Sequence, residues 1–185
     1  MIVGADGASD AAILQRSAAL YGSFGLRRVY YSAFSPIPDS SKLLPLSEPP
    51  LMREHRLYQA DWLTRFYGFE VGEILDDVSG DMLDLTVDPK LAWALRHRGR
   101  FPVDVNRADR ETLLRVPGLG TRSVKSILDM RRFRRLGLAD VARLARSATV
   151  LRNFIVAEGW RPGGLLDSER LKQHLAPKPR QLALL

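Results

Sequence analysis

Residues 113–127 read LLRVPGLGTRSVKSI, and this stretch decides the fold of the second half of the chain. It predicts a short helix at Ala108–Arg115 and a second helix at Thr121–Arg132, because Pro117-Gly118-Leu119-Gly120 breaks the chain between two runs with helical spacing. Gly118 and Gly120 permit backbone angles that are closed to other residues, and they let a ligand approach the backbone closely. The stretch therefore predicts two helices joined by a tight glycine hairpin.

The start of the second helix is a predicted anion site. The first N–H groups of a helix lack intrahelical acceptors and carry a partial positive charge. Hydroxyl and cationic side chains stand at the same point, so one phosphate of a nucleic-acid backbone fits there and no base edge is read. The predicted phosphate-binding residues are Gly118, Gly120, Thr121, Arg122, Ser123 and Lys125, and the predicted additional basic contacts are Arg131, Arg132, Arg134 and Arg135.

This stretch resembles the helix-hairpin-helix DNA-binding motif, whose hairpin consensus is an apolar residue, Pro, Gly, an apolar residue and Gly. The resemblance implies that the amides of Gly118, Gly120 and Arg122 meet phosphate. In several family members the hairpin carbonyls hold a monovalent cation, and by position these would be the carbonyls of Leu114, Val116 and Leu119. The alternative is a hairpin that only joins helices or binds protein, as it does in some members.

The helix-hairpin-helix DNA glycosylases provide an enzymatic alternative. Their lysine-dependent members carry Lys two residues after the second Gly, where this chain has Arg122, and arginine stays protonated and cannot act as an amine nucleophile. Asp140 lies at about the spacing of their catalytic Asp, but it sits near the start of a predicted third helix and lacks the Val-Asp-Thr-His context. We therefore interpret Asp140 as structural and assign no catalytic residue to this chain.

Charge divides the chain into two parts. Residues 1–95 hold 8 Lys and Arg against 13 Asp and Glu, a net charge of −5, whereas residues 96–185 hold 20 against 8, a net charge of +12. This asymmetry favours two units and a polyanionic partner, DNA, for the second one. A solvated basic surface without a partner is the alternative interpretation.

Other features narrow the class of protein. The chain has no cysteine, which excludes disulfides, a thiolate nucleophile and cysteine-held zinc or iron–sulfur clusters in this chain. The three histidines are isolated and lack metal-ligand spacing. No apolar run approaches the roughly 18–20 residues of a membrane span, and the first residues lack a signal-peptide pattern. We expect a cytoplasmic protein without a membrane partner.

The first 50 residues predict a βαβ unit, because an apolar run, a helical pattern and a Val- and Tyr-rich run follow one another. Ser9 or Asp10 is the expected N-cap, and Gly22 and Gly25 end the helix. Such a unit is usually parallel and right-handed. The expected segments are a strand at Ile2–Ala5, a helix at Ala11–Tyr21, a strand at Leu26–Phe34 and a loop at Ser35–Pro50.

Further helices follow. Leu51–Tyr67 is a strong helix candidate, and we interpret its stripe of Leu51, Tyr58, Trp62 and Phe66 as core, with base stacking as the alternative. Asp88-Pro89 starts a short helix, and Asn106 is the expected N-cap of the helix before the hairpin. A third helix opens at Leu138, and Thr149–Val156 adds a fourth segment. The expected domains are 1–50, 51–100 as a helical connector, 101–160 as the helix-hairpin-helix domain and 161–185 as a flexible tail.

The whole chain resembles the C-terminal portion of a bacterial family of radical SAM proteins associated with DNA modification or repair. The resemblance implies an α/β remnant, the last strands of a partial (β/α) barrel, followed by a mostly α helix-hairpin-helix domain. The matching stretches are Ile2–Ala5 to Asp10, Leu26–Phe34, Arg53–Trp62, Asp88–Arg96, Phe101–Asn106 and the hairpin.

The family's chemistry needs three cysteines in a CxxxCxxC loop, which hold a [4Fe–4S] cluster that cleaves S-adenosylmethionine. This chain lacks them, so by itself it is not expected to be a radical enzyme. We expect either a truncated reading of a longer gene or a decayed or separately expressed C-terminal module. In related barrels the ends of these strands touch the cofactor, and the corresponding wall remnants here would be Gly4, Ala5, Ser32 and Phe34.

The sequence thus predicts DNA binding without sequence preference through hairpin–phosphate contacts, with double-stranded DNA and a DNA-repair protein as expected partners. Two alternatives stay open. One is a fragment of a functional radical SAM enzyme acting on nucleic acid. The other is a protein-interaction module that uses the aromatic helix Leu51–Tyr67.

Overall fold

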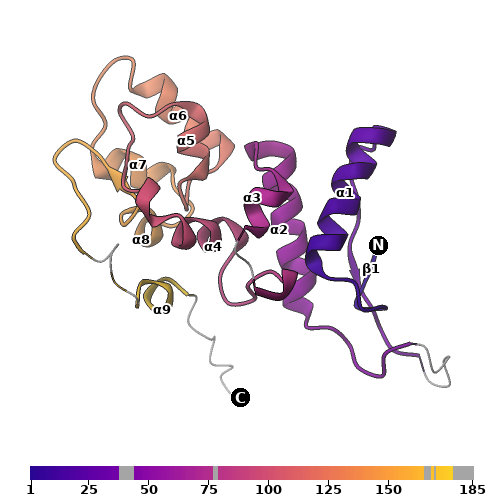
Figure 1. Cartoon of the computed structure of the whole chain (residues 1–185). Helices are drawn as coiled ribbons and strands as arrows, with labels where there is room; N and C mark the ends of the chain where they lie inside the picture. Colours follow the sequence, from indigo (N-terminus) through magenta and orange to yellow (C-terminus); the bar gives the residue numbers. More distant parts are fainter. Residues whose placement is uncertain (38–43, 77–78, 165–167, 169, 177–185) are drawn as a thin grey trace, which may run out of the picture. The chain divides into compact units, whose positions relative to one another are not determined.

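The computed structural model describes residues 1–37, 44–76, 79–164, 168 and 170–176. The chain forms two compact units, Met1–Trp93 and Ala94–Leu185, and the described parts of both are mainly helical with short parallel strand pairs (Figure 1). The division falls inside helix α4 (Pro89–Arg96), so the segment expected as a connector, 51–100, is shared between the units. Parts of the expected loop at 35–50 and tail at 161–185 lie outside the described residues.

The first unit begins with the predicted βαβ arrangement. Strand β1 (Ile2–Val3) pairs in parallel with β2 (Ser32–Ala33), and α1 (Asp10–Phe24) lies between them in sequence. The Ser9 side chain accepts a hydrogen bond from the Ala12 amide at 3.2 Å, which confirms the predicted N-cap. Gly25 ends the helix with φ +63°, a left-handed conformation that glycine adopts without steric cost.

The second strand is much shorter than the predicted Leu26–Phe34. Two backbone amides of that segment donate to tyrosine hydroxyls instead of to a neighbouring strand. The Val29 amide donates to Tyr21 Oη at 3.0 Å, and the Tyr31 amide donates to Tyr58 Oη at 2.9 Å. Side-chain acceptors therefore satisfy this backbone before regular pairing begins at Ser32.

Helix α2 (Leu51–Tyr67) has the predicted bounds. The interpretation of its aromatic stripe as core is wrong for Leu51, Trp62 and Phe66, whereas Tyr58 is half-buried against Tyr31. Trp62 is 51% exposed and Phe66 43% exposed. The face packed against α1 instead carries charged residues that are paired there, such as Arg53, whose Nε lies 2.7 Å from Asp10. A periodicity that counts only apolar residues misses this face. The buried residues of α2 as a whole are Arg53, Arg56, Leu57, Ala60, Asp61 and Leu63.

Buried polar groups hold α1, α2 and the β2 segment together. Asp10 is fully buried, and it accepts from Arg53 and from the Leu83 amide at 2.9 Å. Asp61 accepts from Tyr21 Oη at 2.5 Å and from Arg65 Nε at 2.9 Å. Burial and the hydrogen bond to Asp61 raise the pKa of Tyr21 to about 12. These networks replace part of an apolar interface with specific hydrogen bonds.

The first unit is completed by α3 (Val71–Leu75), η1 (Ser79–Asp81) and the start of α4. Asp88 caps α4, as its side chain accepts from the Leu91 amide at 3.0 Å, and Pro89 is the first helical residue as predicted. The Trp93 ring is fully buried edge-on against Phe69, with ring centroids 5.4 Å apart.

In the described part of the second unit, short helices pack around an apolar core. Two short strands of this unit, β3 (Val103–Asp104) and β4 (Ile155–Val156), pair in parallel with Val103 opposite Ile155. The predicted fourth segment, Thr149–Val156, contains the end of a helix and then β4. The elements are η2 (Arg98–Arg100), β3 (Val103–Asp104), α5 (Arg110–Arg115), α6 (Thr121–Met130), α7 (Leu138–Leu144), α8 (Ala148–Leu151), β4 (Ile155–Val156) and α9 (Leu171–Leu175). Side chains without exposed area in this core include Leu113, Val116, Val124, Ile127, Leu136, Val141, Leu151 and Phe154.

Within the segment expected as a flexible tail, the structure describes α9, whose Leu171 has no exposed area. Leu175 on the same helix is also buried. The Arg98 guanidinium donates to the Ser168 carbonyl at 2.8 Å. The described part of this segment is therefore packed against the second unit.

The prediction that Asn106 caps the helix before the hairpin is wrong. Helix α5 begins at Arg110, and Asp109 is its N-cap, accepting from the Thr112 amide at 2.7 Å. Asn106 instead bridges to Leu136, which lies 30 residues later. Its Nδ2 donates to the Leu136 carbonyl at 3.1 Å, and its Oδ1 accepts from the Leu136 amide at 2.8 Å. Asn106 thus ties the chain before α5 to the chain before α7.

We predict that Asn106→Ala lowers the free energy of unfolding by about 1–3 kcal/mol. The partly buried Leu136 amide loses its acceptor, and the Leu136 carbonyl keeps only the Glu158 amide as a donor. Urea unfolding followed by circular dichroism measures this change. Arg107→Ala is the matched control, since that side chain is 81% exposed and its Nε is 3.8 Å from Asp104. Equal midpoints for the two variants would contradict the bridging role.

Candidate nucleic-acid interface

The hairpin between α5 and α6 is held in place by Gly118. Its φ of +87° is in the left-handed region, where a side chain would be strained. A Cβ at this position would lie 3.1 Å from the Ser147 carbonyl oxygen, and the Gly118 carbonyl accepts from the Arg146 amide at 3.0 Å. The expectation of a special backbone angle is thus confirmed at Gly118. At Gly120 it is wrong, because φ −99° and ψ 172° are extended backbone open to other residues.

Helix α6 starts directly after the hairpin and has ten residues, with Gly120 as its N-cap. Its first backbone hydrogen bond runs from the Val124 amide to the Gly120 carbonyl at 2.9 Å. Among the described residues, no acceptor is found for the amides of Thr121, Arg122 and Ser123. These N–H groups are the free donors of a helix N-terminus, where the partial positive charge favours an anion.

Side chains around these amides have different roles. Arg122 and Lys125 are exposed, and no ion pair is found for either within the described chain. The Ser123 hydroxyl donates to the Leu144 carbonyl at 2.5 Å and so ties α6 to α7. Ser123 therefore offers its amide to a ligand, whereas its hydroxyl proton is used within the fold. Thr121 is half-buried at the first position of the helix.

The four arginines after α6 are not equivalent. Arg131 is half-buried and donates to two carbonyls of the loop before α5, those of Val105 at 3.1 Å and Ala108 at 2.6 Å. Arg134 makes two 2.8 Å hydrogen bonds to Asp140. Arg135 pairs with Glu158 at 2.8 Å. Arg132 is exposed, and no partner for it is found in the described part of the chain, so it is the freest of the four for an external anion.

Asp140, which the sequence placed as structural, organises the start of α7. It accepts from Arg134 and Arg143 and from the Gly137 amide at 3.0 Å. The hydrogen bond from Arg134, followed by that from the Gly137 amide, holds the pKa of this carboxyl well below its usual range. Arg143, which no motif in the sequence singles out, thus belongs to the cluster of hydrogen bonds around Asp140. This cluster fixes the arginine-rich segment between α6 and α7.

The predicted site for a monovalent cation consists of hairpin carbonyls. They belong to three buried residues, Leu114, Val116 and Leu119. The Val116 carbonyl already accepts from the Leu119 amide at 3.2 Å. A carbonyl oxygen has a second lone pair, so this contact leaves it able to meet a cation. Carbonyl oxygens are hard donors, the kind that suit alkali-metal cations.

Arg146 is a residue that sequence reasoning missed. Its amide bonds the hairpin at Gly118, and its exposed side chain starts from this point. It lies 28 positions after Gly118, and only tertiary packing of the α7–α8 loop brings the two together. No local signal in the sequence could have found it.

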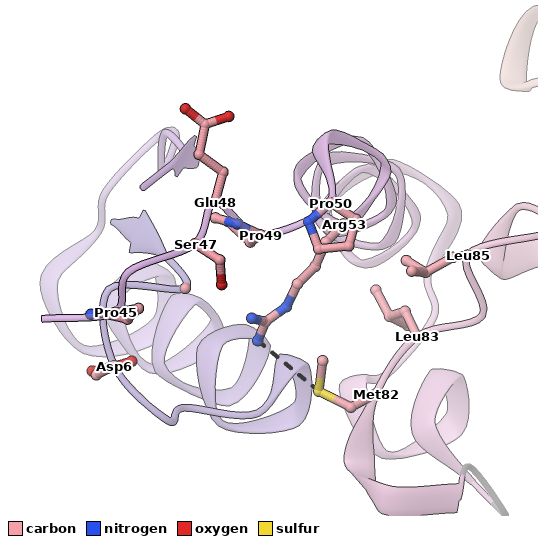
Figure 2. A pocket seen from close by; sticks show the side chains of 11 residues that line it. Asp6, Pro45, Ser47, Glu48, Pro49, Pro50, Arg53, Met82, Leu83 and Leu85 are labelled. Atoms are coloured by element: carbon pink, nitrogen blue, oxygen red, sulfur yellow. Dashed lines mark hydrogen bonds between the residues drawn. The ribbon is translucent and has the colours of Figure 1, made fainter. Parts of the chain in front are cut away.

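The first unit contains a cavity of about 370 Å³ near the end of β1 (Figure 2). Arg53 reaches into its lining, held by Asp10 and by the Ala8 carbonyl at 2.7 Å, and Figure 2 shows its contact with Met82. Of the four predicted cofactor-wall residues only Gly4 lines this cavity. The Pro49 ring packs directly against Gly4, where an added Cβ would lie 2.8 Å from it. The lining does not include Ala5, Ser32 or Phe34.

Two broader findings concern the described residues. No three His, Asp or Glu side chains among them gather so as to hold a metal ion. None of the helices described has the length and apolar character needed to cross a membrane.

Comparison with known proteins gives one informative similarity. Over 137 residues the chain is 29% identical to the Holliday junction branch migration complex subunit RuvA of Micrococcus luteus. The aligned region covers 69% of this chain and 58% of that protein, so the chain spans less than two thirds of the length of this relative. No protein-family model matches the chain, and no solved structure matches it.

We predict that Gly118→Ala lowers the free energy of unfolding by about 1–3 kcal/mol, from left-handed strain and the close Ser147 carbonyl. Gly99→Ala is the matched control, because Gly99 is in the same unit and a Cβ there meets nothing within 4 Å. Thermal and urea unfolding measure both variants. Control-like stability of Gly118→Ala would show that the hairpin does not depend on this conformation.

A second prediction concerns pH. Because the folded pKa of Asp140 is depressed, its stabilising contribution is present above the unfolded carboxyl pKa of about 3.9 and is lost as pH falls below it. Asp140→Asn should therefore be less stable than the native chain at pH 7, and the difference should shrink as the pH falls below 4. Asp129→Asn, an exposed change on α6, is the control. A difference that is the same at pH 7 and at low pH would contradict this assignment.

Proposed function

We propose that this chain binds double-stranded DNA without sequence preference, by capturing a backbone phosphate at the N-terminus of α6. The observation that carries the proposal is the run of free amides at Thr121, Arg122 and Ser123 behind a left-handed glycine turn. Amide donors and the helix dipole recognise phosphate oxygens, which are the same on every nucleotide.

The charge of the second half and the similarity to RuvA support the same proposal. Residues 96–185 carry a net charge of +12 (20 Lys and Arg against 8 Asp and Glu), so a polyanion is attracted to this part of the chain. The name of RuvA places that protein at Holliday junctions, which are DNA. A helix-hairpin-helix domain that binds DNA is consistent with both findings.

In this mechanism the hairpin amides fix the position of one phosphate, and the basic side chains attract the DNA backbone. A phosphate oxygen accepts from the amides of α6, while Arg122 and Lys125 approach neighbouring phosphates. Arg146, at the side of the hairpin, and Arg132 extend the basic surface. A monovalent cation held by the carbonyls of Leu114, Val116 and Leu119 would add a positive charge beside the bound phosphate.

The proposal extends to radical SAM proteins only for a longer polypeptide that would contain this chain. The parallel βαβ unit of β1, α1 and β2 is compatible with the end of a barrel. The chain has no cysteine, so its own residues do not fit a cysteine-held [4Fe–4S] cluster, and no S-adenosylmethionine chemistry is assigned to it. A CxxxCxxC motif encoded upstream of Met1 would support this parentage. In that setting the present chain would bring DNA, and a DNA-repair partner, to the larger protein.

The test is fluorescence anisotropy of a labelled duplex over a salt series, with the native chain and Arg122→Ala/Lys125→Ala. Each lost phosphate contact reduces the slope of log K against log salt by about 0.9, so the double variant should lose a slope of about 2. Two duplexes of unrelated sequence should give the same affinity, because no base edge is read.

Arg170→Ala/Lys172→Ala is the control, since it removes the same two residue types from the start of α9, also in the second unit. It should leave most of the slope in place. If the two double variants weaken binding equally, attraction is spread over the basic surface and the hairpin is not the site. If the native chain does not bind duplex at all, the hairpin is a connector between helices.

A further inference from the structure

The first unit exposes aromatic rings on a helix whose opposite face is buried. Trp62 and Phe66 are one turn apart on α2, and their ring centroids lie 4.3 Å from each other at 44°. They are 51% and 43% exposed, although both are large apolar side chains. Burial of α2 against α1 uses other residues, so this pair is not needed to close the core.

An arginine is placed among these rings. The Arg65 guanidinium carbon lies 4.9 Å from the centroid of Phe66 and 5.7 Å from that of Trp62. Its Nε pairs with Asp61 at 2.9 Å, and its Nη1 donates to the Arg27 carbonyl at 3.2 Å. Two anchoring contacts therefore fix the cation beside the aromatic pair, so little side-chain freedom remains to be lost on binding a ligand.

The contact from Arg65 to the Arg27 carbonyl places the start of the segment before β2 beside α2, and a second aromatic–arginine pair follows in that segment. In the segment before β2, Val29 and Tyr31 point inward and are buried, whereas Arg28 and Tyr30 between them are exposed. The Arg28 guanidinium stacks over the Tyr30 ring at 4.6 Å, and Tyr30 is 64% exposed. We call Arg27, Arg28, Tyr30, Trp62, Arg65 and Phe66 the arginine–aromatic surface.

The charge of this surface is opposite to that of the half of the chain that contains it. Residues 1–95 have a net charge of −5, yet all charged members of the arginine–aromatic surface are arginines. The carboxylate in contact with it, Asp61, is 1% exposed and is already bonded to Arg65 and Tyr21. A ligand that approaches here meets cations and ring faces, which is the combination that recognises the bases and phosphates of a nucleic-acid strand.

We infer that the arginine–aromatic surface binds single-stranded nucleic acid, with unpaired bases stacked on Trp62, Phe66 and Tyr30 and with phosphates near Arg27 and Arg28. A duplex is excluded as the preferred ligand of this surface because its bases are already stacked on one another and offer no free ring face. The inference goes beyond the proposed function, since it concerns another unit, another surface and unpaired rather than paired strands.

The intrinsic fluorescence of the protein allows a direct test. Trp62 is half exposed, Trp93 has no exposed area, and Trp160 donates through Nε1 to the Arg152 carbonyl. Titration of Trp160→Phe with a twelve-residue oligo-dT should quench the emission of Trp62, because a stacked base lies against the indole. The same titration of Trp62→Phe should give little quenching.

Affinity for labelled oligo-dT is measured separately by anisotropy. Trp62→Ala and Phe66→Ala should each weaken it about 5- to 150-fold, the range for loss of one stacked base. Both side chains are exposed, so circular dichroism should show native folding. Phe133→Ala is the matched control, because that ring is 87% exposed in the second unit and should leave oligo-dT affinity unchanged.

The outcomes separate this inference from the hairpin proposal. Arg122→Ala/Lys125→Ala should weaken duplex binding but keep the quenching of Trp62 at saturating oligo-dT. Native affinity in both Trp62→Ala and Phe66→Ala, or bound oligo-dT without quenching of Trp62, would overturn the inference. Emission of Trp62 that changes with protein concentration but not with oligo-dT would assign the surface to contact between protein copies and would overturn it as well.

Discussion

The left-handed conformation at Gly118 is the constraint on which the second unit depends. A residue without Cβ lets the hairpin lie directly under the Ser147 carbonyl, and the Gly118 carbonyl then accepts from Arg146. This contact joins the α5–α6 hairpin to the α7–α8 loop. Because Gly120, the extended N-cap of α6, follows Gly118 by two residues, the same turn leads directly into the free amides of α6. Folding and the candidate phosphate site therefore share one backbone conformation.

Polar side chains, rather than apolar ones alone, fix the segments around that constraint. Asn106 and Arg131 bond carbonyls and amides of loops that precede other helices, and Asp140 collects two arginines and the Gly137 amide. In the first unit Asp10 and Asp61 likewise join α1 to α2, since Asp10 accepts from Arg53 and Asp61 accepts from Tyr21. Several charged residues that a sequence assigns to solvent or ligand are thus committed to structure. This leaves Arg122, Lys125 and Arg146 as the freer cations near the hairpin, and Arg132 beyond the other end of α6.

Local signals predicted the parts of the fold that local physics controls. The Ser9 cap, the Gly25 ending, the bounds of α2 and the glycine hairpin depend on neighbouring residues, and they were found from the sequence. Contacts between distant residues were not. Asn106 has the chemistry of a cap but finds a better partner at Leu136, and Val29 and Tyr31 donate to tyrosine hydroxyls instead of extending a strand. The interpretation of the α2 stripe as core is wrong at Leu51, Trp62 and Phe66, because the helix buries Arg53 and Asp61 instead. The burial of these two charged residues depends on partners on other segments.

The most direct test of the central claim observes the amides themselves. In ¹H–¹⁵N correlation spectra of the full chain titrated with a duplex, the account predicts that the largest shift changes fall on Thr121, Arg122 and Ser123, with Gly118 and Arg146 next. It also predicts that the changes are the same for duplexes of unrelated sequence. Binding that leaves these amides unmoved, while signals on other basic segments such as Arg132 shift, would contradict phosphate capture at the N-terminus of α6.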